Sequence, residues 1–261
     1  MAIYRNIERV LWVFLLTLLF LTSCSKKKVD PTVIDNDDVG KVEKIAEYKL
    51  DVVEPSGLCF GRDHNSLFTV SDNSNKVYEI DFEGNIIREL AYSGGDLEGV
   101  TYNDDDDILA IVEERNRQVV LLNYDSGEEI NRYDIDVKVN DENKGLEGIS
   151  WNTNNKAYYL LNENNPALMM VWKKDVGIIS EVDLNFAGDY SGIFVDAGHS
   201  ILWIVSDESQ MLYKCDYNVN VLKKYELNFS KAEGVVVDVL SNRIYVVSDK
   251  LSKLFVFQIV K

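Results

Sequence analysis

A hydrophobic strand start built around one glycine occurs five times in this chain, and it constrains the fold more than any other feature. The five copies read Pro55-Ser56-Gly57-Leu58, Leu97-Glu98-Gly99-Val100, Leu146-Glu147-Gly148-Ile149, Tyr190-Ser191-Gly192-Ile193 and Ala232-Glu233-Gly234-Val235. The steps between successive glycines are 42, 49, 44 and 42 residues. A period of about 40–50 residues indicates an array of similar supersecondary units.

A second run of apolar, β-branched and aromatic residues follows each glycine and ends at an acidic residue. The five acidic ends are Asp72, Glu114, Glu163, Asp207 and Asp249. A third such run follows at residues 76–80, 118–122, 168–172, 211–215 and 253–257, and tight turns lead on to a fourth strand. Four antiparallel strands in about 42 residues are typical of a β-propeller blade, whereas solenoid repeats are shorter or need a helical periodicity that is missing here.

The last repeat ends after its third strand, and its fourth strand is expected at the other end of the domain. Ile45, Tyr48 and Leu50 have the spacing of Leu222, Tyr225 and Leu227 in the outer strand of the fourth repeat. Leu50 and Leu227 each lie seven residues before the next repeat glycine. We therefore expect an all-β, five-bladed propeller over residues 41–261, closed by pairing of residues 42–51 with residues 253–260, which removes open sheet edges.

Residues 1–24 have the features of a bacterial lipoprotein signal peptide. Arg5 and Arg9 precede an apolar run over residues 10–21, which is shorter than the approximately 20 residues of a membrane span. Leu21-Thr22-Ser23-Cys24 resembles a lipobox, in which Cys24 is lipidated, and the alternative is a secretory signal cut elsewhere. Residues 25–40 read as a flexible linker, and the lysines at 26–28 favour an outer-membrane anchor that faces the periplasm.

Charge and cysteine usage limit the partners. Removing residues 1–23 leaves 25 basic and 43 acidic residues, a formal charge of −18, which repels nucleic-acid phosphates and attracts cations. Cys59 and Cys215 belong to separate repeats, too far apart for a disulfide, and we expect two buried free thiols. The sequence contains no Cys-x-x-Cys pair, phosphate-binding loop or zinc-protease motif.

The residues directly before the repeat glycines form the first candidate site. They are expected near one mouth of the central channel, and they are Ser56, Glu98, Glu147, Ser191 and Glu233. Oxygen ligands without Cys or His suit a hard cation, Ca²⁺ or Mg²⁺. The alternative is that the glutamates accept backbone N–H groups of neighbouring blades and lock the ring.

The second acidic column is expected to cap the turns that follow it, or to support a bound cation from behind its ligands. It consists of Asp72, Glu114, Glu163, Asp207 and Asp249. His64 and His199 fall in turns expected on the opposite rim, away from the acidic mouth, which argues against a histidine-based catalytic group there.

The repeat motifs resemble the SdiA-regulated domain family of envelope lipoproteins. The matching segments are Glu54-Pro55-Ser56-Gly57-Leu58, Ser71-Asp72, Asp96-Leu97-Glu98-Gly99-Val100, Gly145-Leu146-Glu147-Gly148-Ile149 and Glu233-Gly234-Val235. The resemblance covers residues 41–261 and implies a five-bladed propeller with a calcium-responsive role. It carries over no catalytic residues, and Ser191 departs from the glutamate of the other units.

Three functions are compatible with these patterns. The first is a membrane-anchored, non-enzymatic protein that binds Ca²⁺ or a small ligand at the acidic mouth. The second is a Ca²⁺-dependent hydrolase of lactones or phosphoesters that uses the same rim, by analogy with propeller enzymes in which the ion acts as a Lewis acid. The third is a platform for a protein ligand, with the insertion at residues 140–144 as a contact.

Overall fold

The computed structural model describes residues 39–137 and 145–260. Contacts divide the chain into residues 1–35 and 36–261, and all described residues belong to the second unit. The signal peptide, Cys24, most of the linker and the insertion at 140–144 lie outside the described residues. Within the described ranges, no helix has the length and apolar character needed to cross a bilayer.

The described residues form an all-β fold, apart from one short 3₁₀ turn at Arg62–His64. The five strands that begin at the repeat motif are β2 (Pro55–Phe60), β6 (Leu97–Asn103), β10 (Leu146–Asn152), β14 (Gly192–Asp196) and β18 (Ala232–Asp238). The strands that end beside the acidic column are β3 (Leu67–Ser71), β7 (Ile108–Glu113), β11 (Ala157–Asn162), β15 (Ile201–Ser206) and β19 (Arg243–Ser248). Both sets lie where the repeat predicts them.

The third and fourth strands of each unit complete antiparallel sheets. The third strands are β4 (Lys76–Ile80), β8 (Gln118–Asn123), β12 (Leu168–Lys173), β16 (Met211–Asp216) and β20 (Lys253–Val260). The fourth are β5 (Ile86–Ser93), β9 (Glu129–Asp134), β13 (Gly177–Asp183), β17 (Val221–Glu226) and β1 (Val39–Lys49). Three four-stranded sheets result, in the orders β2-β3-β4-β5, β6-β7-β8-β9 and β10-β11-β12-β13.

The remaining strands form one eight-stranded sheet rather than two separate ones, in the order β14-β15-β16-β17-β1-β20-β19-β18. β1 joins the two halves because Val39 and Gly40 pair in parallel with Lys224 and Tyr225 of β17. From Lys41 onwards, β1 runs antiparallel to β20. The predicted pairing of the N-terminal strand with residues 253–260 is therefore found. β1 begins at Val39, two residues inside the segment expected to be linker.

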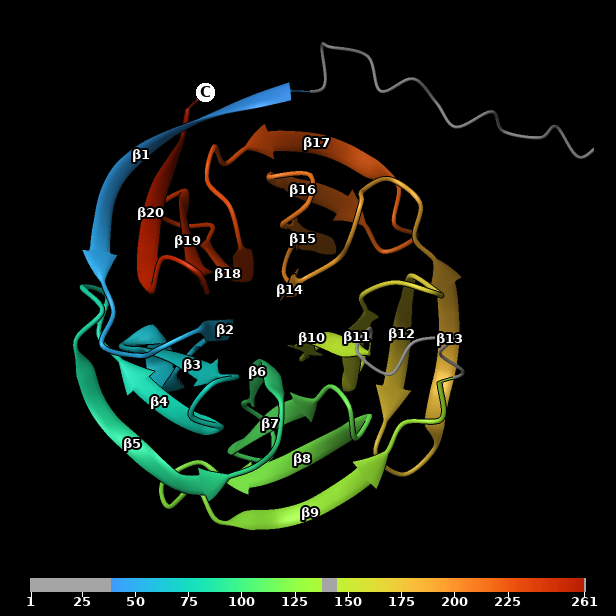
Figure 1. The fold of residues 1–261 in the computed structure, drawn as a ribbon. Helices are drawn as coiled ribbons and strands as arrows, with labels where there is room; N and C mark the ends of the chain where they lie inside the picture. Colours follow the sequence, from blue (N-terminus) through green and yellow to red (C-terminus); the bar gives the residue numbers. More distant parts are fainter. Residues whose placement is uncertain (1–38, 138–144, 261) are drawn as a thin grey trace, which may run out of the picture. The chain divides into compact units, whose positions relative to one another are not determined.

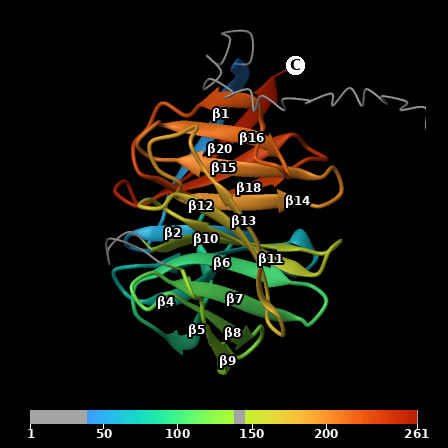
Figure 2. The same cartoon turned by 90° about the vertical axis from the view of Figure 1, so that its right-hand side faces the viewer.

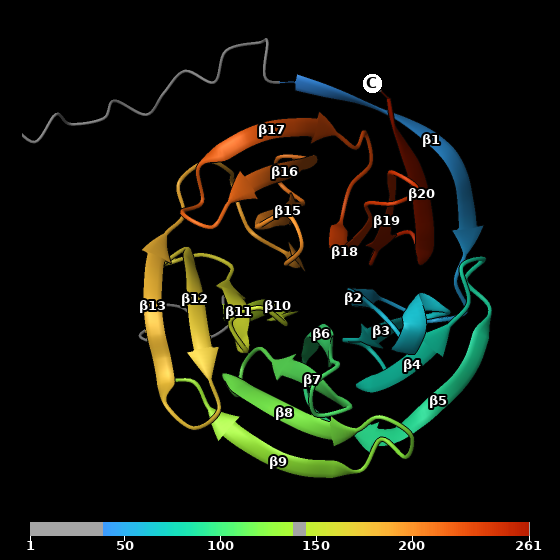
Figure 3. The same cartoon turned by 180° about the vertical axis from the view of Figure 1, so that it is seen from behind.

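The sheets stand side by side around a central axis (Figure 1), and the view from behind shows the same order (Figure 3). β2, β6, β10, β14 and β18 lie nearest the axis and contact one another in turn, with β18 returning to β2. Seen from the side, β6, β10 and β14 follow one another (Figure 2). β3, β7 and β11 are buried along their whole length, which explains their uninterrupted apolar sequences, whereas the outer strands β9 and β13 are largely exposed.

The repeat glycine is required by this close approach of the innermost strands. A Cβ atom on Gly57 would lie 2.7 Å from the backbone oxygen of Glu98, and one on Gly99 would lie 2.8 Å from that of Glu147. Gly57 also has a φ of 52°, which disfavours other residues. The glycine column therefore marks the points at which neighbouring units touch backbone to backbone.

Candidate functional site

A cavity of about 170 Å³ lies where the innermost strands begin, and we call it the acid cavity. Its lining contains all five residues that precede the repeat glycines, Ser56, Glu98, Glu147, Ser191 and Glu233. Asp72, Glu163 and Asp249 of the second column also line it, together with Asp189 and Lys231. The structure thus brings the first candidate column together in one place.

Local irregularities of the innermost strands help to aim these side chains. The pairing register shifts between Ser56 and Cys59 on β2, and between Leu97 and Gly99 on β6. Equivalent shifts occur at the start of β10 and β18. A β-bulge re-aims a side chain and interrupts regular pairing, and bulges are frequent beside binding sites. At β2, β6, β10 and β18 a bulge thus accompanies the residue that lines the cavity, whereas β14 pairs regularly.

Glu98 and Glu147 carry the least compensated charge of the acid cavity. Burial raises the pKa of Glu98 well above 4.5, and the nearby carboxylates of Asp72 and Glu233 raise it further, although the Ser56 hydroxyl opposes this. Burial likewise raises the pKa of Glu147 well above 4.5, followed by repulsion from Glu98 and Glu233. The hydrogen bonds among the described residues include none to the Glu147 carboxylate. Like charges in a poorly hydrated site disfavour ionisation unless a cation is present.

Glu233 lies beside Lys231, the one basic side chain among the described residues that line the acid cavity. Lys231 Nζ is 3.7 Å from Glu233 Oε1 and 3.3 Å from Asp207 Oδ2. Burial raises the pKa of Glu233 to about 8, although Lys231 acts to lower it. Burial acts to lower the pKa of Lys231, but attraction by Glu233 and Asp207 outweighs it and the pKa lies above its usual value. Lys231 therefore neutralises only one side of the cavity.

Two groups of three carboxylates converge closely enough to share a cation. Asp72, Asp96 and Glu98 form one group, and in each group the contributing oxygens all lie within 4.8 Å of one another. Glu114, Glu147 and Glu163 form the other. Burial raises the pKa of Asp72 to about 6, with further effect from Asp96, and burial raises that of Glu114 to about 7. Converging carboxylate oxygens of this kind match the ligand preference of Ca²⁺.

Two members of the second column hold neighbouring units together rather than capping their own turns. Glu114 Oε1 accepts the backbone N–H of Gly145 at 2.9 Å, and Asp207 accepts that of Lys231. The turns after β3 and β15 are capped by the preceding serines instead. Ser71 Oγ accepts the N–H of Ser74 at 3.0 Å, and Ser206 Oγ accepts that of Ser209 at 3.1 Å. The carboxylates of Glu114 and Asp207 thus reach across to the next unit.

Glu114 and Asp207 of the second column make the kind of bond between units that was considered for the glutamates of the first column. None of the described residues donates a backbone hydrogen bond to Glu98, Glu147 or Glu233. Those three side chains are left facing the cavity, as a ligand-binding role requires.

Asp96, Asp189 and Lys231 belong to the site but were not singled out in the sequence. Each lies two residues before a member of the first column, just ahead of the innermost strand of its unit. Asp189 is only 4% exposed and accepts hydrogen bonds from the Ser206 hydroxyl and the Glu208 N–H. Burial raises its pKa. The sequence signal for these residues is a charged side chain three positions before the repeat glycine, in the second, fourth and fifth repeats.

The remaining candidate groups lie away from the acid cavity. His64 and His199 are exposed, as expected for turn residues. Cys59 and Cys215 are free and buried, which confirms the prediction of two isolated thiols. Burial raises the pKa of Cys215 to about 12 and that of Cys59 further, so neither is suited to act as a nucleophile.

Comparison with solved structures places this fold among the β-propellers. Glutaminyl cyclase from Myxococcus xanthus superposes with a TM-score of 0.64 at 13% identity, covering 84% of this chain and 97% of that one. Virginiamycin B lyase from Staphylococcus aureus superposes with a TM-score of 0.50 at 18% identity, covering 79% of this chain and 66% of the lyase. This chain thus spans about two thirds of the lyase. At these identities the likeness concerns the fold alone.

The family is established by sequence. The SdiA-regulated family model matches residues 41–258, which is most of the chain, and the protein belongs to that family. The resemblance carried by the repeat motifs is confirmed. The match spans the propeller-like unit and all residues of the acid cavity.

Proposed function

We propose that this protein is a five-bladed propeller, lipid-anchored at Cys24, that binds Ca²⁺ in the acid cavity without catalysing a reaction. Its place is the bacterial cell envelope, on the outer membrane facing the periplasm. The blade count takes β14–β17 as one blade and β18–β20 with β1 as another. The eight-stranded sheet is then two blades joined by the short parallel pairing of β1 with β17.

The surroundings of Glu147 carry the calcium proposal. Its pKa is raised by burial and by four carboxylates, Glu98, Glu233, Glu114 and Glu163. Ca²⁺ takes about 6–8 oxygen ligands, and carboxylates, serine hydroxyls and water can supply them together. A bound divalent cation would convert this mutual repulsion into attraction and would displace protons from the raised-pKa carboxylates.

The size of the acid cavity favours an ion over an organic substrate. Its volume is about 170 Å³. Sites for drug-sized molecules enclose roughly 300–1,000 Å³. A cation with a few waters fits the smaller space, which supports a binding role rather than a reaction.

Calorimetry on the purified full-length protein, stripped of metal with chelator, tests this proposal. We expect saturable binding heat with Ca²⁺ and a rise in melting temperature at millimolar Ca²⁺. Glu147→Gln keeps the side-chain shape but removes the central charge, and should weaken binding at least about tenfold, or about 1.4 kcal/mol. Glu226→Gln changes an exposed carboxylate on β17 and is the matched control. The proposal is refuted if Ca²⁺ produces no binding heat and no rise in melting temperature.

The anchor is tested separately. Cys24→Ala should release the protein from the membrane fraction into the soluble periplasmic fraction, with the melting temperature of residues 41–261 unchanged. Mass spectrometry of the wild-type N-terminus should show an acylated Cys24. A soluble wild-type protein with an unmodified N-terminus elsewhere would argue for the ordinary secretory signal.

A Ca²⁺-dependent lactonase or phosphoesterase is the second candidate. The pKa values of Glu114 and Glu233, about 7 and about 8, suit general acid–base catalysis near neutral pH. A panel of lactones and phosphomonoesters assayed with Ca²⁺ tests it. Turnover that is lost in Glu147→Gln and kept in Glu226→Gln would favour the enzyme, and no turnover would leave binding as the function.

A further inference from the structure

A second cavity lies at the opposite end of the innermost strands. Its volume is about 630 Å³, and residues of β2, β6, β10, β14 and β18 and of the turns that follow them line it. Tyr102, in this cavity, lies four positions after Glu98, in the acid cavity, which corresponds to about 13 Å of extended strand. We call it the aromatic cavity. Unlike the acid cavity, its volume falls in the range of small-molecule sites.

Aromatic side chains from four different strands form its walls. Phe60, Tyr102, Trp151 and Phe194 all line the cavity, and the first three stand three residues after a repeat glycine. Phe60 and Phe194 meet edge to face, with ring centroids 6.0 Å apart. Between these walls the lining is apolar and buried, with Leu58, Ile149 and Val237 4%, 3% and 2% exposed. The lining therefore offers aromatic and apolar surface to an occupant.

The charged groups of this lining are mainly acidic. Asp63, Asp104, Asp196 and Asp238 contribute carboxylates, and Arg62 is the one permanently charged basic residue among the described lining residues. Asp104 Oδ1 accepts the indole N–H of Trp151 at 3.0 Å, which places a carboxylate at the edge of an aromatic wall. Asp196 pairs with His199 at 2.8 Å.

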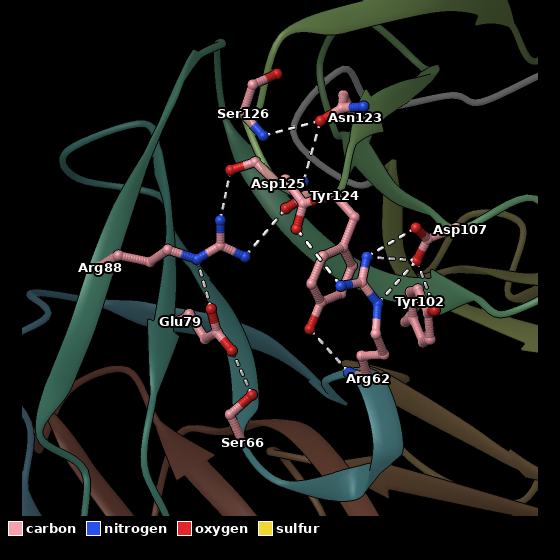
Figure 4. Close-up of polar contacts among 10 residues, drawn as sticks. All are labelled: Arg62, Ser66, Glu79, Arg88, Tyr102, Asp107, Asn123, Tyr124, Asp125 and Ser126. Atoms are coloured by element: carbon pink, nitrogen blue, oxygen red, sulfur yellow. Dashed lines mark hydrogen bonds and ion pairs between the residues drawn. The ribbon is translucent and has the colours of Figure 1, made fainter.

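Arg62 is paired with carboxylates that do not themselves line the aromatic cavity. Its Nη2 donates to both carboxylate oxygens of Asp107, at 2.8 and 2.7 Å, and Nη1 lies 3.5 Å from Asp125 (Figure 4). The guanidinium also lies over the Tyr124 ring, 4.2 Å from its centroid. These contacts direct the Arg62 guanidinium toward Asp107, Asp125 and Tyr124, none of which lines the aromatic cavity.

We propose that the aromatic cavity binds a small organic cation, an ammonium group on an apolar or aromatic body. Aromatic faces attract cations, by about 0.5–1 kcal/mol at exposed sites and about 2 kcal/mol or more where water is excluded. The acidic rim adds attraction to the same charge, and the apolar surface takes up the body of the molecule. This inference is independent of the calcium proposal, since it concerns other residues at the other end of the strands.

Tryptophan fluorescence of the full-length protein offers a direct test. Trp172 and Trp203 are 3% and 2% exposed, whereas Trp151 is half-buried in the cavity wall, so a ligand there should change the emission of Trp151. The probes are 2-phenylethylammonium, neutral 2-phenylethanol and anionic 3-phenylpropionate. We expect saturable binding of the ammonium, about tenfold weaker binding of the alcohol and none of the carboxylate.

Two variants locate the site by calorimetry with 2-phenylethylammonium. Asp104→Asn keeps an acceptor for the Trp151 indole but removes an exposed charge, and should weaken binding about threefold. Trp151→Leu removes the ring and should weaken it about tenfold or more. Glu147→Gln, in the acid cavity, should bind the probe as the wild type does. The proposal is overturned if no probe binds, if charge makes no difference among the probes, or if Asp104→Asn binds normally.

Discussion

The acid cavity and the aromatic cavity occupy the two ends of the same innermost strands, yet they treat charge in opposite ways. In the acid cavity, carboxylates face one another and a single lysine offsets part of their charge, so that the pKa values of Glu98 and Glu147 are raised. Around the aromatic cavity, Arg62 is paired with Asp107, and the pKa of Asp107 is lowered by that hydrogen-bonded arginine. Mutually repelling carboxylates therefore identify the first site, and aromatic walls with an acidic rim identify the second.

The local backbone explains part of this difference. Where the innermost strands begin, bulges turn side chains toward the axis. Where they end, polar residues satisfy tight turns. Asn103 Oδ1 accepts the N–H groups of Asp105 and Asp106, and Asp238 accepts those of Leu240 and Ser241. The Asn103 and Asp238 side chains at the second end thus stabilise the turns that follow their own strands.

Deleting residues 39–49 should have the largest effect, because both cavities need a closed ring. The deletion exposes the edges of β20 and β17 and removes the partly buried Val42, Ala46 and Tyr48 from the core. We expect a loss of several kcal/mol and a fall in melting temperature of at least about 10 °C. Differential scanning calorimetry measures it, and Ile45→Ala, at a side chain that is 48% exposed, is the mild control. Unchanged cooperative melting would mean that closure is dispensable.

Glu114→Ala should cause the second-largest loss of stability, and the change is confined to the acid-cavity end of the innermost strands. It leaves the N–H of Gly145 without its acceptor, which costs about 1–3 kcal/mol, or roughly 2–10 °C in melting temperature. Glu114→Gln retains an oxygen acceptor and should recover most of the stability. Equal losses in both variants would show that charge, and not the bond to the next unit, is what matters at this position.

The repeat allowed the strand order, the closing pair and the first acidic column to be predicted, because the glycine period and the acidic ends are local patterns. The function of Glu114 could not be predicted in that way. Whether its carboxylate reaches its own turn or Gly145 of the next unit depends on how two sheets pack. The aromatic cavity was missed for a related reason. Tyr102 and Trp151 resemble ordinary strand aromatics, and only the turn geometry and the pairing of Arg62 show what surrounds them.

The stability of the metal-free protein should depend on pH through the acid cavity. Glu114 and Glu233 have pKa values of about 7 and about 8 when folded, whereas an unfolded glutamate titrates near 4.3. Between these values the folded protein binds more protons than the unfolded chain. The contribution of these groups to stability is therefore present at low pH and is lost as pH rises toward 8. Thermal melts without metal at pH 5, 6, 7 and 8 measure it.

Glu147→Gln separates this effect from the overall acidity of the protein. Glutamine mimics the protonated acid, so the variant should melt with the wild type at pH 5 and a few degrees above it at pH 8. Glu226→Gln makes the same change in net charge at an exposed site, and its melting temperature should equal that of the wild type at pH 5 and at pH 8. If Glu147→Gln melts lower than the wild type at pH 8, the ionised Glu147 carboxylate makes a stabilising interaction in the folded protein, and the repulsion argument is wrong.

Leu240→Ser should have the smallest effect and bears on the aromatic cavity. Leu240 lines its rim and is 94% exposed, so its replacement should change the free energy of unfolding by less than about 0.5 kcal/mol. An exposed leucine contributes hydrophobic free energy only when a ligand covers it, so Leu240 should stabilise the complex but not the free protein. Affinity for 2-phenylethylammonium should therefore fall about two- to threefold, measured by calorimetry. Leu222→Ser, at a 47% exposed position on β17, should change neither quantity. Equal affinities in the wild type, Leu240→Ser and Leu222→Ser would show that the ligand contacts the aromatic walls but does not reach Leu240 at the rim.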